Sequence, residues 1–258
     1  MLEPYANDPK NRGQLYFDPD KYKEAVMQLD HLGFQIFTHA IGDRAIRLAL
    51  DAYEAANKAN GRTDARDKIE HIEDPSAEDI PRFGKLGVIA SMQPLHTTPN
   101  DNNLNVWAGN VGPERAQRAW PWRDILAGGA VLSFGSDWSV VTLNPWPAVQ
   151  ICLTLEEAIQ GYTMGCAFAA RREKTEGSIE VGKLADVIVI SQDLFKIAPN
   201  QIGKTKVMMT MVGGKVVYQD PSWRGEQSAA SKSQQSLSGP KPVLRLKQIG
   251  DVFQAERL

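Results

Sequence analysis

The sequence is poor in features that mark several protein classes. It has two cysteines in 258 residues, Cys152 and Cys166, without metal-type spacing, which favours buried thiols in a reducing, cytoplasmic setting. Its net charge is only -2, so nothing favours nucleic acid or an anionic membrane as a partner. No apolar run approaches the roughly 20 residues that span a bilayer. The first residues also lack the basic region and apolar core of a signal peptide.

Short apolar runs alternate with helical patterns over the first part of the chain. The first run, 34–43, ends in a histidine and a glycine, and apolar residues at helical spacing follow it. Similar runs occur at 68–72, 87–94 and 130–137. This strand and helix alternation predicts parallel βα units, and therefore the α/β fold class.

The pattern changes beyond the first 175 residues, which we interpret as the α/β part of the chain. Within 176–220 the apolar segments follow one another without helices, and Gly213-Gly214 suits a tight hairpin turn, which predicts a small β layer beside the α/β part. The last segment, 221–258, is rich in Ser, Gln, Lys and Gly, so it is expected to be a disordered tail.

Three polar side chains lie at the C-terminal ends of predicted strands. They are His39, His71 and Asp137. Because the carboxyl ends of parallel strands share one edge, ligands and catalytic groups collect there. Imidazole and carboxylate are ligands that zinc accepts, and a catalytic zinc needs three protein groups and an open position. Histidines at strand ends are also often hydrogen-bonded core residues, so both interpretations stay open at this point.

The sequence resembles a known family through an ordered set of motifs. They are His39-Ala-Ile-Gly-Asp43, Ile69-Glu-His71, Ala90-Ser-Met-Gln-Pro94, Phe134-Gly-Ser-Asp-Trp138, Leu155-Glu-Glu-Ala158 and Gly182-Lys-Leu-Ala-Asp186. Over about residues 2–220 the chain is similar to the metal-dependent amidohydrolases of the amidohydrolase 3 type. The resemblance implies a TIM (β/α)8 barrel with a β-sandwich, of which this chain would supply strands five to eight.

The resemblance also implies site residues and an activity. His39 and His71 would be metal ligands, and Asp137 would be both a ligand and the general base. His96 follows Gln93-Pro94 and resembles a position near the substrate, although a solvent-facing loop histidine fits equally well. The implied cofactor is a divalent metal, zinc by preference. The implied reaction is hydrolysis of carbon-nitrogen bonds in small, non-peptide amides by a metal-activated water.

The chain resembles only the second half of the family's sequence. The family carries a His-x-His on strand one and a commonly carboxylated lysine on strand four, and neither occurs here. We therefore expect a truncated, C-terminal half of an amidohydrolase that needs the missing ligands for full activity. A half-barrel exposes an unpaired strand edge, which favours an oligomer or a complementing chain.

Two alternatives to this enzyme remain. The first is a non-catalytic remnant that acts as a binding or oligomerisation module. The second is a mononuclear metal site built from His39, His71 and Asp137 alone, which three-ligand zinc chemistry permits.

Overall fold

The computed structural model describes residues 1–223, 244–249 and 252–257 of the chain. The chain divides into two compact units. The first comprises Met1–Gly177 and Asp193–Thr205, and the second comprises Ser178–Gln192 and Lys206–Leu258. None of the helices described is both long enough and apolar enough to cross a membrane.

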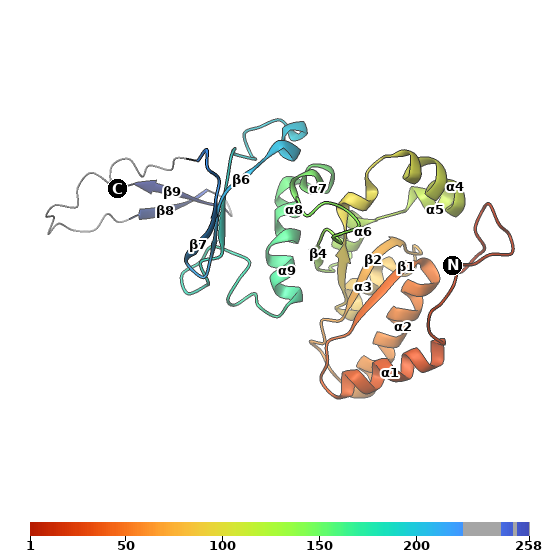
Figure 1. Cartoon of the computed structure of the whole chain (residues 1–258). Coiled ribbons are helices and arrows are strands. Elements are labelled where there is room, and N and C mark those ends of the chain that lie inside the picture. Colours follow the sequence, from red (N-terminus) through yellow and green to blue (C-terminus); the bar gives the residue numbers. More distant parts are fainter. Residues whose placement is uncertain (224–243, 250–251, 258) are drawn as a thin grey trace, which may run out of the picture. The chain divides into compact units, whose positions relative to one another are not determined.

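The first unit is built on a four-stranded parallel sheet (Figure 1). Its strands are β1 (Phe37–Gly42), β2 (Lys68–Asp74), β3 (Ile89–Met92) and β4 (Leu132–Phe134), and they lie in sequence order. Helices α2 (Asp43–Asn60), α3 (Ile80–Leu86) and α6 (Trp122–Ala127) alternate with them. The parallel pairing confirms the predicted α/β class and its parallel strands. Neighbouring parallel strands need a crossover connection, and these helices lie in those connections.

The remaining helices of this unit are short apart from the first. They are α1 (Pro19–His31), α4 (Ala108–Val111), α5 (Pro113–Gln117), α7 (Trp146–Ile151), α8 (Leu155–Tyr162) and α9 (Met164–Ala169). The chain also forms the 3-10 helices η1 (Pro94–Thr97) and η3 (Pro199–Lys204) and a π-helix, η2 (Asn102–Trp107).

The core of the first unit lies between the sheet and α2. Ile46, Leu50 and Tyr53 are fully buried on one face of α2, as the helical spacing of the sequence predicted. The Tyr53 hydroxyl donates to the Lys68 carbonyl oxygen at 2.9 Å and lies 2.5 Å from the Thr38 hydroxyl. These contacts join α2 to β1 and β2, so α2 holds the two strands that carry the candidate histidines His39 and His71.

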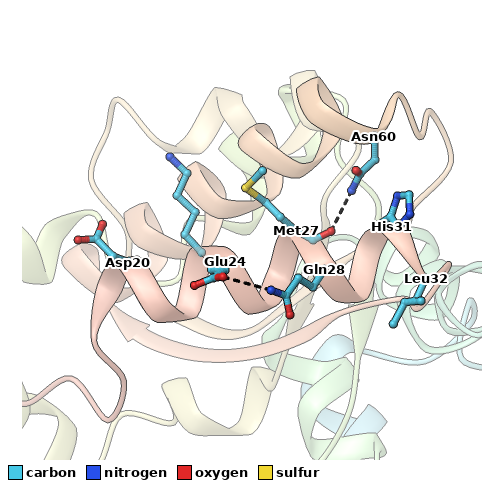
Figure 2. A pocket seen from close by; sticks show the side chains of 8 residues that line it. Asp20, Glu24, Met27, Gln28, His31, Leu32 and Asn60 are labelled. Atoms are coloured by element: carbon cyan, nitrogen blue, oxygen red, sulfur yellow. Dashed lines mark hydrogen bonds between the residues drawn. The ribbon is translucent and has the colours of Figure 1, made fainter.

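A buried ion pair joins α1 to the segment after α2. The Asp30 side chain is fully buried, and Arg62 Nη1 lies 2.6 Å from Asp30 Oδ1. Asn60 Nδ2 donates to Asp30 Oδ2 at 2.8 Å and to the Met27 carbonyl oxygen at 3.0 Å. The hydrogen bond between Asn60 and Met27 borders a pocket of about 610 Å³ along α1 (Figure 2). The fully buried carboxylate therefore depends on two donors from outside its own helix.

The second unit contains an antiparallel sheet. Its strands are β5 (Val187–Ile190), β6 (Val207–Val212) and β7 (Lys215–Gln219), in the order β5-β6-β7. Gly213 and Gly214, with φ of 54° and 79°, form the turn between β6 and β7, as predicted. Asp193–Thr205, which lies within the segment 176–220, belongs to the first unit.

The tail predicted to be disordered falls largely outside the described residues, which exclude 224–243, 250–251 and 258. Two strands within it, β8 (Leu244–Ile249) and β9 (Val252–Arg257), pair with each other in antiparallel register. The composition that predicted disorder is concentrated before residue 240, whereas both strands contain apolar residues at intervals. The disorder of the tail as a whole stays a prediction.

Candidate metal centre

Two of the candidate ligands lie on neighbouring parallel strands. His39 belongs to β1 and His71 to β2, where Ala40 is the register partner of His71. The two imidazole rings contact each other edge to face, with centroids 4.4 Å apart. His71 is buried and His39 is exposed. Both strands extend three residues beyond their histidines, to Gly42 and Asp74, so these side chains lie within the strands and not at their ends.

The backbone at the site is unusual at two of the candidate ligands. His71 has φ of 78° and Asp137 has φ of 56°, and Ile72 has φ of 53°. The register between β1 and β2 also shifts between Ala40 and Gly42. A non-glycine residue in the left-handed region costs on the order of 1–3 kcal/mol, and such residues concentrate where a side chain must be aimed at a ligand.

His96 joins the other candidates from the loop after β3. It lies in η1, and its ring stacks on that of His71 with centroids 5.7 Å apart and planes within 9° of parallel. His96 Nε2 lies 3.7 Å from Asp137 Oδ2. One potential ligand atom from each of His71, His96 and Asp137 lies within 4.8 Å of the other two. The structure thus gathers all four candidate side chains, but His39 is outside this group of three and instead contacts His71.

The polar atoms of this group are suited to a cation. His71 Nδ1 and His96 Nε2 are both buried and have no hydrogen-bond partner among the described residues. Buried nitrogens are normally paired, so two unpaired ones in one cluster require an explanation. Burial lowers the pKa of both histidines, so each imidazole is neutral near pH 7 and can offer a lone pair. Two neutral imidazoles and a carboxylate fit a zinc-type ion.

A glutamate that sequence analysis missed borders this group. Glu73 Oε2 accepts a hydrogen bond from Trp107 Nε1 at 3.1 Å, and Glu73 Oε1 lies 3.9 Å from His96 Nδ1. Burial raises the pKa of the Glu73 carboxyl. Its position two residues after His71 was the one available signal, since alternate strand residues share a face. The contact itself depends on the loop that carries His96 and Trp107.

A second buried carboxyl near the end of β2 predicts a pH effect on stability. Asp74 is 1% exposed, neither of its side-chain oxygens has a hydrogen-bond partner in the described part of the chain, and Arg118 Nε lies 3.8 Å from Asp74 Oδ1. Burial, followed by the charge of Asp43, raises the pKa of Asp74 from 3.8 to about 6. The folded state therefore holds this proton more tightly than the unfolded state. Stability should fall as the pH rises from about 4 to about 6, by about 3 kcal/mol in total.

Asp74→Asn should remove this penalty because its neutral amide resembles the protonated acid. We expect a higher free energy of unfolding than in the unsubstituted chain at about pH 8, by up to about 3 kcal/mol, and no gain at about pH 4. Urea unfolding at both pH values measures this. Asp124→Asn, at an exposed position, is the control and should change stability by less than about 1 kcal/mol. An equal gain from Asp74→Asn at both pH values would contradict the expectation.

Comparison with known proteins places these features in context. The family model described as "Amidohydrolase family" matches residues 1–218 of the chain. Protein LONG AFTER FAR-RED 3 of Arabidopsis thaliana is 32% identical over 236 residues, which cover 84% of this chain and 40% of that protein. The N-substituted formamide deformylase of Arthrobacter pascens is 26% identical over 223 residues, which cover 80% of this chain and 41% of the enzyme.

A solved structure also matches this chain over part of its length. An uncharacterized metal-dependent hydrolase from Pyrococcus horikoshii matches with a TM-score of 0.64 and 25% identity, over 77% of this chain and 42% of that chain. The chain therefore spans about two fifths of the length of these three proteins.

Proposed function

The chain belongs to the amidohydrolase family, and from this premise we propose that it carries part of the active site of a metal-dependent hydrolase. The reaction would be cleavage of carbon-nitrogen bonds in small, non-peptide amides. The name of the relative from Arthrobacter pascens supports N-substituted formamides as a first substrate class to test. The four-stranded parallel sheet would supply strands five to eight of a (β/α)8 barrel.

One observation supports this proposal above the others. Ligand atoms of His71, His96 and Asp137 lie within 4.8 Å of one another, and two nitrogens of this cluster are buried without a hydrogen-bond partner among the residues that the structure describes. In the proposal these three residues hold a divalent ion, with zinc preferred. His39 stays a candidate ligand because its exposed imidazole contacts His71.

The mechanism assigns separate tasks to the side chains. A bound metal would act as a Lewis acid and lower the pKa of a water near it. The Asp137 side chain is 38% exposed, so it is the group of the cluster that substrate can reach. Its carboxylate would take the proton from the attacking water and return it to the departing amine. The neutral, largely buried His71 and His96 would keep their lone pairs directed at the ion.

The open face of β1 supports a role for a further chain or chain segment. Phe37 and Ile41 are 57% and 40% exposed and share a strand face with His39. We propose that in the active protein this face is covered by the rest of a barrel, either in an oligomer or in a complementing chain. Full activity would then require that completion.

Metal analysis and an amide assay test the proposal. After dialysis against zinc the purified chain should retain about one equivalent of zinc. Any residual hydrolysis of N-substituted formamides by the chain alone should depend on that zinc and be removed by a chelator, whereas robust hydrolysis by the chain alone would contradict the need for completion. Retention of less than about a tenth of an equivalent, with a stable folded oligomer, would contradict the proposal and favour a non-catalytic binding module.

A further inference from the structure

The loop that follows β4 exposes apolar side chains directly beside Asp137. Trp138 is 67% exposed, and Val140 and Leu143 in the same loop are exposed as well. The Trp138 side chain has no hydrogen bond or ring contact with another residue that the structure describes. Exposed apolar side chains that cluster, unlike single ones, mark a surface that contacts a ligand or another protein.

A turn holds Trp138 close to the Asp137 carboxylate. The Val140 N–H donates to the Asp137 carbonyl oxygen at 2.7 Å, and the Trp138 N–H donates to Ser136 Oγ at 3.2 Å. The Cα atoms of neighbouring residues are only about 3.8 Å apart. A molecule of the size of an amide that contacts the carboxylate can therefore also contact the indole.

The loop that carries His96 supplies a second apolar border. Leu104 and Val106 are exposed in η2. Asn103 Nδ2 donates to the His96 carbonyl oxygen at 2.6 Å, which ties η2 to the segment of that histidine. Short π-helical turns also occur frequently at functional sites. Both loops that supply candidate ligands from outside β1 and β2 therefore expose apolar side chains.

Neither loop carries a lysine or an arginine. Residues 94–112 and 135–145 contain none, and their acidic residues are Asp101 and Asp137. Proteins normally recognise carboxylate and phosphate groups with arginine or lysine. An anionic substituent would thus find no such cation on these loops, whereas a neutral apolar one would contact the exposed side chains.

We propose that Trp138 is a specificity-determining residue that binds a neutral aromatic group carried on the amide nitrogen of the substrate. This inference rests on the proposed function, in which Asp137 returns a proton to the departing amine. The amide nitrogen then lies next to Asp137, so its substituent reaches the neighbouring indole. Aromatic pairs contribute stabilisation beyond the area that they bury, which makes an aromatic substituent the best fit.

A protein surface is the alternative occupant, because a completed barrel would bring further loops to this edge of the sheet. The position of the indole directly beside the reactive carboxylate favours the substrate. The two occupants differ in what Trp138→Ala changes. Loss of a substrate contact lowers the affinity for aromatic ligands, whereas loss of a protein contact lowers self-association.

The test compares the binding of two neutral formamides to the zinc-loaded chain by NMR titration. Formanilide carries a phenyl group on nitrogen, and N-methylformamide carries only a methyl group. We expect the unsubstituted chain to bind formanilide about tenfold or more tightly. Trp138→Ala should bring the two affinities to within about threefold, and Trp138→Phe should keep most of the preference because a ring remains. The carboxylated analogue para-formamidobenzoate should bind more weakly than formanilide.

Leu32→Ala is the matched control. Leu32 is an exposed apolar residue at the end of α1, which leads into β1, so it lies at the edge of the sheet opposite to Asp137. This substitution should leave the preference unchanged. Both Trp138 and Leu32 are exposed, so both alanine variants should stay folded, and urea unfolding verifies this.

Two results would overturn the proposal directly. They are an unchanged preference in Trp138→Ala and equal binding of the two formamides by the unsubstituted chain. A folded Trp138→Ala that loses self-association in sedimentation but keeps the preference would also overturn it, because the indole would then be an interface residue.

Titrations of the zinc-free chain separate this inference from the proposed function. If the chain takes up no zinc but Trp138→Ala still loses the preference for formanilide, the proposed function fails and the recognition role of Trp138 stands. If the chain takes up zinc and the preference does not respond to Trp138→Ala, the recognition role fails alone.

Discussion

Replacing His71 with alanine is expected to weaken zinc binding by more than about 100-fold. The loss of an outer-shell partner alone typically costs about 10–100-fold in affinity, and the loss of a direct ligand should cost more. His71 is the central member of the cluster, because its ring contacts those of both His39 and His96. Chelator competition and metal content after dialysis measure the loss.

The backbone at this position calls for a second variant. Alanine at φ of 78° is strained, so His71→Ala could lose zinc simply because it unfolds. Asparagine tolerates the left-handed region better and offers no imidazole nitrogen, so His71→Asn should lose zinc while it stays folded. His31→Ala removes an exposed imidazole near the end of α1 and should bind zinc normally. Normal zinc uptake by a folded His71→Asn would remove His71 from the site.

Arg62→Met is expected to lower the free energy of unfolding by about 3–5 kcal/mol. The substitution leaves the fully buried Asp30 carboxylate without its cation, and an uncompensated buried charge is strongly destabilising. Asn60 alone would then donate a side-chain hydrogen bond to this carboxylate among the described residues. Urea unfolding of the metal-free chain gives the difference directly.

Two comparisons identify the cause of that loss. Arg12→Met breaks an exposed pair with Glu3 and should cost less than about 1 kcal/mol. Asp30→Asn combined with Arg62→Met removes both charges, so it should recover part of the stability lost in Arg62→Met alone. A loss below about 1 kcal/mol in Arg62→Met would show that the buried carboxylate is compensated in another way.

The sequence predicted the parallel sheet because its signal is local. The apolar run around His39, followed by residues at helical spacing, is what a βα unit requires, and the structure confirms it as β1 and α2. The turn at Gly213 and Gly214 was predictable for the same reason. The family was also predictable, because several motifs had to occur in order.

The finer features of the site were not predictable, because they depend on distant parts of the chain. Nothing local to His71 indicates a left-handed backbone, since the conformation is set by the packing around it. Glu73 reaches His96 and Trp107 only because the segment after β3 folds back over β2. The return of Asp193–Thr205 to the first unit likewise leaves no composition signal.

The order of the parallel strands has a consequence for where a substrate can be held. Strands β1 to β4 follow one another across the sheet in chain order, and this progression never reverses in the part of the chain that is described. In nucleotide-binding sheets a reversal separates two neighbouring loops and opens a crevice between them. With no reversal among β1 to β4 there is no such crevice, and the candidate groups come instead from within two neighbouring strands, β1 and β2, and from the segments that follow β3 and β4.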